Sequence, residues 1–474
     1  MAGLISYGAY IPACRLNRTD VGAVVGGGGR GTRAVANFDE DTTTMAVAAA
    51  SDALRAMPAD VEPARLLFAT TSPAYADKAN ATAVHAALSL PSSVLAFDLV
   101  GSVRTGIGAL ELAATGGEPS LVVIADQRGG LPGGSDEIDG GDAAVAFLFG
   151  EAGQGPVIAE LVTSASVTEE FLERWRLPQD HAARVWEERF ASEIYPAMAK
   201  EALAKALGAA GKSADDIDHL IVSGMNARAV KDIAKRSGVG PEAIVDARET
   251  VIGNAGAAQA GLMLADVLDT TGSDKLIVIL VLSDGVTASV LKTTDALIQA
   301  RSPHPVAAQV PGSIAVQYAD FLGWRGRLER EPQRRPKPVP PYAPPAYRRR
   351  RWKFGLVGGR CSHCGWRHVN AGRICLSCRS VDTMMPEPMA QVPGTVAFAT
   401  VDRLAYSPQP PLTMVHVNFD GGGRLRCQLA DAPDGWDPVG QRVEMSFRRM
   451  TTADGIHNYF WKARPARPVR DGGE

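Results

Sequence analysis

The first 300 or so residues carry one order of helix-like and strand-like segments twice. A helix-prone stretch, a short apolar run, a glycine-containing helix and a second apolar run follow one another at residues 42–57, 66–69, 101–114 and 121–125. The same order returns at residues 193–210, 218–223, 253 onward and 276–282. The matching positions 66 and 220, 101 and 253, and 121 and 276 are 154, 152 and 155 residues apart. This repeat predicts a duplicated half-domain, and the alternation predicts an α/β fold with helices on a mainly parallel sheet.

The last third of the chain has a different pattern. Residues 313–331 are expected to form an amphipathic helix, and residues 332–345 contain seven prolines. Because proline lacks the backbone donor that helices and central strands need, this proline-rich stretch is predicted to be an extended tether with no helix. Short alternating segments follow at residues 395–401 and 412–418, and turns separate them. They predict a small antiparallel barrel.

Four cysteines form two C-x-x-C pairs that ten residues separate: Cys361, Cys364, Cys375 and Cys378. A C-x-x-C turn lets two thiolates reach one ion, and two such turns complete a tetrahedral shell of four sulfurs. This spacing predicts a structural zinc ion with no open coordination position. An iron site of rubredoxin type and a redox dithiol are the alternatives. Since the four sulfurs already complete the shell, His363 and His368 are expected to be surface residues.

The composition is that of a globular protein, with 46% hydrophobic residues, 21% charged residues and a formal net charge of −3. This charge argues against a nucleic-acid binder that neutralises phosphates over its whole surface. No apolar run reaches the roughly 18 residues of a membrane span, and no basic segment precedes an apolar one at the start. Four of the six cysteines lie in one cluster, as in metal sites of reducing compartments. A cytoplasmic protein that binds neither nucleic acid nor membrane is therefore expected.

The starts of the two matching glycine-containing helices are candidate sites. A helix N-terminus presents free N–H groups and the positive end of a dipole, which lower the pKa of a nucleophile or bind an oxyanion. Ser102 and Thr105 lie at the first start, and Asn254 lies at the second. Close packing of small residues is the alternative explanation for both. The glycine run at residues 26–31 lacks the Gly-Lys-Ser/Thr ending of a phosphate loop and is predicted to be a flexible loop.

Several segments carry a resemblance to known families. ISYGAYIP (5–12), DEDTTTMA (39–46), GDAAVAF (141–147) and GNAGAA (253–258) resemble the thiolase superfamily, most closely 3-hydroxy-3-methylglutaryl-CoA (HMG-CoA) synthase of the archaeal type and ketosynthase III. Residues 352–378 and GTVAF (394–398) resemble the zinc-ribbon plus OB-fold proteins that accompany such enzymes. The resemblance implies a thiolase-like α/β fold, duplicated into five αβαβα layers, followed by a zinc ribbon and an OB-fold β-barrel. The implied boundaries are 1–165 and 166–300 for the two thiolase-like halves, 301–350 for a helix and linker, 351–388 for the ribbon and 389–474 for the OB-fold.

The resemblance also implies where the family's catalytic residues fall. The nucleophilic cysteine of the family aligns with Val103, the histidine with Ser223 and the glutamate with Thr71. Asn226 and Asn254 remain at polar family positions. Because a valine side chain cannot be acylated, this alignment excludes the usual acyl-cysteine mechanism.

Other residues are candidates to replace the missing groups. Ser102 is adjacent to Val103 and could serve as a nucleophile, although Ser223 is a poor base for it. His219 and His304 are candidates for a relocated base, with a satisfied or surface histidine as the alternative for each. Cys14 is expected to be a core residue.

Two functions follow from these residues and the resemblance. The first is an acyl-CoA enzyme of the acyltransferase, condensing-enzyme or aldolase class that makes or breaks a carbon–carbon bond without an acyl-cysteine intermediate. The second is a degenerate acyl-CoA-binding scaffold whose zinc-ribbon and OB-fold part docks a partner thiolase or condensing enzyme. A homodimer is expected, because thiolase-fold proteins complete their sites across a two-fold interface. The CoA phosphates are predicted to meet a basic run: Arg348, Arg349, Arg350 and Arg351.

Overall fold

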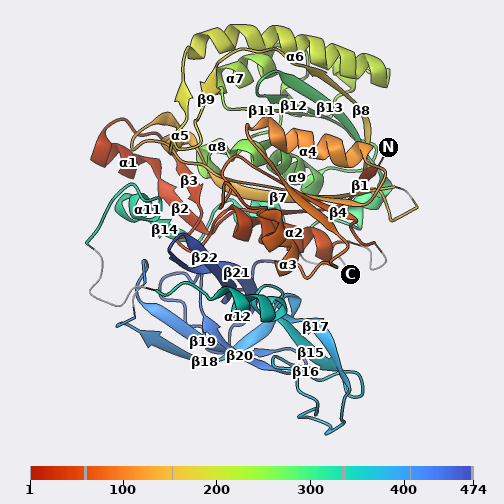
Figure 1. The fold of residues 1–474 in the computed structure, drawn as a ribbon. Coiled ribbons are helices and arrows are strands. Elements are labelled where there is room, and N and C mark those ends of the chain that lie inside the picture. Colours follow the sequence, from red (N-terminus) through yellow and green to blue (C-terminus); the bar gives the residue numbers. More distant parts are fainter. Residues whose placement is uncertain (1, 58–60, 152, 332–337, 406, 471–474) are drawn as a thin grey trace.

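The computed structural model describes residues 2–57, 61–151, 153–331, 338–405 and 407–470. Its largest element is a nine-stranded sheet with the order β11-β12-β13-β8-β1-β7-β6-β4-β5 (Figure 1). The strands of this sheet are β1 (Gly3–Tyr10), β4 (Arg65–Thr70), β5 (Leu95–Val100), β6 (Ser120–Gln127), β7 (Asp142–Gly150), β8 (Ala159–Val167), β11 (His219–Gly224), β12 (Leu276–Leu282) and β13 (Val286–Thr293).

The two halves of this sheet have the same local pairing. In the first half β4 pairs with β6 in parallel, and β6 pairs with β7 antiparallel. In the second half β11 pairs with β12 in parallel, and β12 pairs with β13 antiparallel. A single pair, Leu4 with Ala159, joins β1 to β8 between the halves. The repeated segments of the sequence therefore occupy equivalent positions in the sheet. The expectation of a mainly parallel sheet was wrong, since parallel pairing among the described strands of this sheet is limited to β4 with β5 and β6 and to β11 with β12.

Helices separate the halves and cover their outer faces. Helices α4 (Arg104–Thr115) and α9 (Gln259–Thr270) belong to one apolar cluster with side chains of both halves of the sheet, and α9 is buried along almost its whole length. Helix α2 (Thr42–Arg55) packs against β1 and β7 on the opposite face of the first half. Helix α6 (Glu188–Ala210) covers the second half (Figure 1). These layers make the thiolase-like α/β arrangement, and no helix of the described residues is long and apolar enough to cross a bilayer.

Shorter elements complete this part. A small sheet pairs β2 (Cys14–Asn17) with β3 (Thr32–Val35) and with β14 (Ile314–Val316), and Cys14 is buried in its core as expected. The other elements are α1 (Arg18–Val25), α3 (Ala81–Ala87), α5 (Ser135–Asp139), β9 (Arg174–Trp175), β10 (Arg184–Val185), α7 (Ala227–Arg236), α8 (Glu249–Ile252), the 3-10 turn η3 (Gly256–Ala258), α10 (Val306–Gln309) and α11 (Tyr318–Trp324).

Two further sheets form the C-terminal part. The first has the order β16-β15-β17 and consists of β15 (Val357–Cys361), β16 (Arg367–His368) and β17 (Met384–Pro388). The second has the order β20-β19-β18-β21-β22 and consists of β18 (Gly394–Asp402), β19 (Leu412–Phe419), β20 (Arg424–Gln428), β21 (Arg442–Ala453) and β22 (Ile456–Pro465). A parallel bridge from Leu429 to Ala463 links the end of β20 to β22. Because this bridge brings the two edges together, we call the five strands the barrel.

Two expectations for the connecting region were wrong. Residues 313–331 do not form one helix: β14 adds a strand to the small sheet, and α11 occupies only Tyr318–Trp324. The proline-rich stretch is not free of helix either, since α12 (Ala343–Arg348) has Pro344 and Pro345 at its start, and α13 (Arg350–Lys353) follows. Proline is tolerated in a first helical turn because the N–H groups there have no intrahelical partner. Residues 332–337 of the stretch lie outside the described residues.

Candidate functional site

The start of α4 is where the thiolase resemblance places the catalytic cysteine. The helix begins directly after Val103, whose side chain is buried, whereas Ser102 is exposed. The carbonyl oxygen of Ser102 accepts hydrogen bonds from the backbone N–H and from the hydroxyl of Thr105, at 3.1 and 2.8 Å. These bonds fix the first turn of the helix. The valine side chain has no atom that could carry an acyl group.

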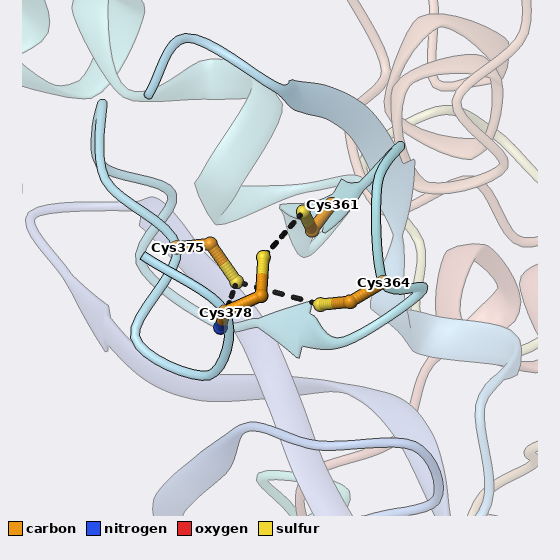
Figure 2. Close-up of side chains that lie close together, drawn as sticks. All are labelled: Cys361, Cys364, Cys375 and Cys378. Atoms are coloured by element: carbon orange, nitrogen blue, oxygen red, sulfur yellow. Dashed lines mark hydrogen bonds between the residues drawn. The ribbon is translucent and has the colours of Figure 1, made fainter. Parts of the chain in front are cut away.

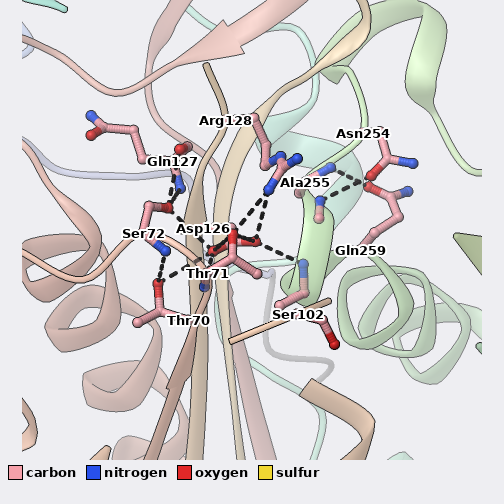
Figure 3. A network of polar contacts seen from close by, with 12 residues as sticks. Thr70, Thr71, Ser72, Ser102, Asp126, Gln127, Arg128, Asn254, Ala255 and Gln259 are labelled. Carbon is pink, nitrogen blue, oxygen red and sulfur yellow. Dashed lines mark hydrogen bonds and ion pairs between the residues drawn. The ribbon is translucent and has the colours of Figure 1, made fainter. Parts of the chain in front are cut away.

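A buried carboxylate at the end of β6 organises the neighbouring strand ends (Figure 3). Asp126 is inaccessible to solvent. Its Oδ1 accepts a hydrogen bond from the backbone N–H of Thr71 at 2.7 Å, and its Oδ2 accepts one from the hydroxyl of Thr71 at 2.9 Å. Oδ2 also accepts a bond from the backbone N–H of Ala257 at 2.8 Å. Asp126 therefore ties the end of β4 to the turn that precedes α9.

Two arginines complete the surroundings of Thr71. Arg128 donates a hydrogen bond to the Thr71 hydroxyl at 2.9 Å, and its guanidinium lies 3.8 Å from Asp126. Burial lowers the pKa of Arg128, and the charge of Asp126 opposes that shift. Arg176 donates to the backbone carbonyl of Thr71 at 2.6 Å. With its hydroxyl bonded to both Asp126 and Arg128, Thr71 is held as part of a fixed network.

The turn before α9 places Asn254 next to this network. The Asn254 side chain accepts a hydrogen bond from the backbone N–H of Gly256 at 2.9 Å and donates to the carbonyl of Gly224 at 3.0 Å. Gly256 has a φ of 57°, and an added Cβ would lie 2.3 Å from Oδ2 of Asp126, so no larger residue fits. Ser223, which is buried, directly precedes Gly224. Thr71 thus lies against Asp126, and Asn254 joins the end of β11 at Gly224 to the turn that leads to Ala257.

Asn226 is engaged elsewhere. Its side chain accepts from the backbone N–H of Ala229 as the cap of α7 and donates to Glu173 at 3.0 Å. The other carboxylate oxygen of Glu173 accepts from the hydroxyl of Tyr195 on α6, at 2.5 Å. Burial and then the charge of Glu173 raise the pKa of Tyr195. Sequence reasoning missed this cluster and Asp126, because each group meets partners from distant elements and no local motif marks it.

The two histidines proposed as relocated bases have other partners. His219 lies at the first residue of β11, at the opposite end of the strand from Ser223 and Gly224, and its Nε2 is 2.8 Å from the Thr271 hydroxyl. His304 is buried, with its Nδ1 3.1 Å from Asp52. These contacts correspond to the alternative of satisfied structural histidines.

The four cysteines converge as the spacing predicts (Figure 2). Their sulfurs all lie within 4.8 Å of one another, with 3.7 Å between Cys361 and Cys378 and 3.6 Å between Cys364 and Cys375. A tetrahedral shell with metal–sulfur bonds of about 2.3 Å places its sulfurs about 3.8 Å apart, so the four thiols fit one ion of that size. Hydroxyl groups of Ser380 and Thr383 lower the pKa of Cys361 to about 5, which favours the thiolate that binds metal.

The expectation that both neighbouring histidines lie at the surface was wrong for one of them. His363 is exposed, but His368 is buried, with its Nε2 3.5 Å from the sulfur of Cys375. The backbone pairing of β16 with β15 at Gly359 turns His368 inward toward the cysteines.

Two basic regions could hold an anionic ligand. The first region is exposed and lies beside the C-terminal part of the molecule rather than at α4 (Figure 1). It consists of residues at the end of α12, at the start of α13 and between them: Arg348, Arg349, Arg350 and Arg351. The second region is a cavity of about 620 Å³ between α6 and α7. Five cations and two acids are among its lining residues: Arg189, Arg228, Lys231, Lys235, Arg236, Glu193 and Asp232. This cavity lies near the end of β11, because Ser192, which lines the cavity, is 3.4 Å from Asn226, two residues after that strand.

Sheet order, buried central helices and outer helices define a thiolase-type α/β fold, and comparison with known proteins supports this class. The chain is 29% identical over 350 residues to hydroxymethylglutaryl-CoA synthase of Methanothermobacter thermautotrophicus, which covers 69% of this chain and 99% of that protein. It is 27% identical over 353 residues to the synthase of Archaeoglobus fulgidus, with 69% and 100% covered. The chain therefore contains sequence beyond what these relatives have. No protein-family model matches it.

Solved structures show the same fold at lower identity. A 3-oxoacyl-[acyl-carrier-protein] synthase III from Aquifex aeolicus matches with a TM-score of 0.54 and 21% identity, covering 62% of this chain and all of that one. An HMG-CoA synthase complexed with CoA matches with a TM-score of 0.57 and 15% identity, covering 68% of this chain and 89% of that one. The chain is thus similar in sequence to hydroxymethylglutaryl-CoA synthases and shares the fold of the synthase III structure.

Proposed function

We propose that this protein handles acyl-CoA thioesters and makes or breaks a carbon–carbon bond in them without an acyl-cysteine intermediate. The observation that carries the proposal is the similarity to HMG-CoA synthases along almost their whole length. The resemblance implies Val103 at the position of their cysteine, which accounts for the missing acyl-cysteine intermediate. Ser102 and Asn254 are the groups we assign to the reacting thioester, because Ser102 lies just before α4 and Asn254 lies in the turn before α9. We also propose Thr71, Ser223 and Asn226 as site residues on the resemblance, and Asp126 holds Thr71 in place.

Purified protein incubated with acetyl-CoA, acetoacetyl-CoA and a β-hydroxyacyl-CoA tests the proposal. Release of free CoA or of a shorter thioester by the protein alone, lost in Ser102→Ala or Asn254→Ala, supports an enzyme. Ser362→Ala, an exposed serine on the cysteine-containing part, is the matched control and should keep full activity. Equal turnover in all three variants would contradict the assignment.

A second function is favoured by one observation. The oxygens of Asp126 accept hydrogen bonds from Thr71 and Ala257, and the side chain of Asn226 caps α7, so both groups already have structural partners. This arrangement suits an acyl-CoA-binding scaffold that docks an active thiolase or condensing enzyme. Turnover that appears only after a partner thiolase is added would favour the scaffold over the enzyme.

We assign a structural zinc ion to the four cysteines and a zinc ribbon to β15, β16 and β17. The spacing of the four sulfurs supports this assignment. We also assign an OB-fold to β18–β22, on the support of their order and of the parallel bridge that closes β20 on β22. One equivalent of zinc per purified chain, with no visible charge-transfer bands of an iron–sulfur site, is the expected result.

For the CoA phosphates, the run at Arg348–Arg351 and the cavity between α6 and α7 are competing sites. Calorimetric titration of CoA into two variants separates them: Arg348–Arg351 changed to Ala, and Arg228, Lys231 and Lys235 changed to Ala. The variant that loses affinity for CoA identifies the site. Each lost phosphate contact of about 1.4 kcal/mol should weaken the affinity about tenfold. Unchanged affinity in the first variant would remove the basic run from consideration.

We further propose that the protein forms a homodimer. Strand β5 is an edge of the nine-stranded sheet, and Leu95 and Val100 on it are 60% and 50% exposed. An exposed apolar edge strand favours pairing with another strand. Light scattering that gives the mass of one chain at micromolar concentration would contradict this proposal.

A further inference from the structure

Strands β21 and β22 of the barrel contact the thiolase-like part through buried charges. Arg448 on β21 is inaccessible to solvent and lies 3.1 Å from Asp39 and 3.0 Å from Glu40, just before α2. Lys462 on β22 is also buried and lies 2.8 Å from Asp39. Arg448 additionally pairs with Asp431 of the barrel. Residues more than 400 positions apart in the sequence thus share one closed ionic cluster.

A second ionic cluster continues this contact along α2. Asp52, which is fully buried on α2, lies 2.7 Å from Arg467, just after β22. Arg467 also pairs with Glu444 of β21 at 2.7 Å, and Arg464 pairs with Glu444 at 2.8 Å. Between these charges, Met45, Ala46 and Ala50 of α2 share an apolar cluster with Phe447 and Trp461 of the barrel.

These contacts make the two surfaces specific for each other. A buried charge without its partner is strongly unfavourable, whereas a complementary pair is tolerated and selects the correct partner. The acids Asp39 and Asp52 come from the thiolase-like part, and Arg448, Lys462 and Arg467 come from the barrel. Because Arg448, Lys462 and Arg467 each pair with an acid across the boundary, the face is specific for the thiolase-like part.

The hairpin end of β21 and β22 reaches the loop that follows β4. The backbone N–H of His457 donates to the Tyr75 hydroxyl at 2.7 Å, and the two rings lie 4.7 Å apart. Tyr459 donates to Asp41 at 2.8 Å, and Thr42, the next residue, donates to the carbonyl of Ser72 at 2.9 Å. The same loop begins with Thr71, which bonds to Asp126. The barrel is thereby linked to the candidate site through two short chains of contacts.

We propose that the β21–β22 face is a dedicated docking surface for the thiolase-like part of the same chain, and that docking positions the loop of residues 71–80 beside Asp126. Association on this face does not require the covalent tether. The same face is closed to any partner protein, so a partner enzyme must bind another surface. The proposal depends on the contacts at this boundary and not on acyl-CoA as the ligand.

Cleavage of the folded chain tests the docking. A specific protease site placed between Pro338 and Val339, an exposed position, would cut the connection after folding. The two fragments are expected to stay together in equal amounts, with the same total mass as the uncut protein, in size-exclusion chromatography with light scattering at physiological salt. Separation of the fragments would overturn the proposal. A species of two fragments of each kind that forms only after cleavage would also overturn it, because it would show that the face prefers another copy.

The positioning step is tested by hydrogen exchange in the full chain. Tyr75→Phe removes the hydroxyl that accepts from His457, and we expect amides of residues 72–79 to exchange about tenfold faster. Tyr347→Phe, an exposed tyrosine on α12, is the matched control and should leave those amides unchanged. Equal exchange in Tyr75→Phe and wild type would show that the barrel does not position the loop. This result is independent of CoA binding, so it separates failure of this inference from failure of the proposed function.

Discussion

The cysteine cluster and the site at the start of α4 differ in how the chain assembles them. All four sulfurs come from one segment between Cys361 and Cys378, and two tight turns bring them together. The α4 site combines the ends of β4, β6 and β11 with the turn before α9, so Thr71 and Ala257 meet on Asp126 from far apart in the sequence. A site formed by one short motif can therefore be predicted from the sequence, whereas a site built from distant strands can be recognised only once the fold is known.

Loss of one ligand should break the cysteine cluster completely. Structural zinc sites contribute on the order of 10 kcal/mol to folding, so Cys375→Ser should release the metal and unfold β15–β17 while the nine-stranded sheet persists. Metal content by plasma mass spectrometry and limited proteolysis measure this. Ser362→Ala, exposed beside the cluster, should keep its metal. Full metal retention in Cys375→Ser would refute the assignment.

At the α4 site, too, loss of a single buried residue should destabilise the protein, in this case through lost hydrogen bonds. Asp126→Ala leaves the Thr71 and Ala257 N–H groups without a buried acceptor, and we expect a loss of about 4 kcal/mol in the free energy of unfolding. Denaturant titration measures it. The exposed Asp434→Ala should change the free energy by less than about 0.5 kcal/mol. A small effect at both positions would mean that Asp126 does not organise the site.

Beside the boundary with the thiolase-like part, Glu444 of β21 pairs with Arg464 and Arg467 of the C-terminal part, and pH probes these ion pairs. Burial alone would raise the pKa of Glu444, but Arg464 and Arg467 lower it from 4.5 to about 2. A carboxyl whose pKa is lowered on folding stabilises the protein above its unfolded pKa, so up to about 3 kcal/mol is present above about pH 5 and is lost as the pH falls toward 2. In Glu444→Gln, stability should fall less steeply between pH 5 and 2. Identical slopes would argue against this ion pair.

The smallest effect should occur at Ser102, just before α4. Ser102 is exposed, so Ser102→Ala should change the free energy of unfolding by less than about 0.5 kcal/mol. Gly106→Ala, one turn further along α4, should be much more damaging, because its Cβ would lie 2.4 Å from the carbonyl oxygen of Ala257. Thermal unfolding of the two variants compares them. Similar melting temperatures would show that the start of α4 is packed differently.

The sequence predicted the parts of the fold that periodicity and motifs encode. The run at residues 276–282 coincides with β12, the run at 66–69 lies inside β4, and the cysteines converge as their spacing indicates. Helix α12 was missed because a proline count ignores position in the first turn, and β14 was missed because its strand partner, β2, lies about 300 residues away. Asp126 was missed because a single acid at a strand end carries no local signature.

The same limit explains the boundary with the barrel. From the sequence alone, Arg448 would be expected at the surface, since a charged side chain in a strand is ordinarily solvated. Its burial depends on Asp39 and Glu40, which reach it only when both parts have folded. The domain boundaries at 165, 300, 350 and 388 remain predictions.

Whether an acyl-CoA binds next to Val103 without acylating the protein is tested most directly by intact-protein mass spectrometry paired with calorimetry. After incubation with acetyl-CoA or acetoacetyl-CoA, we expect saturable binding in the calorimeter and an unchanged protein mass. A mass increase equal to the acyl group, mapped to a residue at the start of α4, would contradict the account. Absence of binding would contradict it as well.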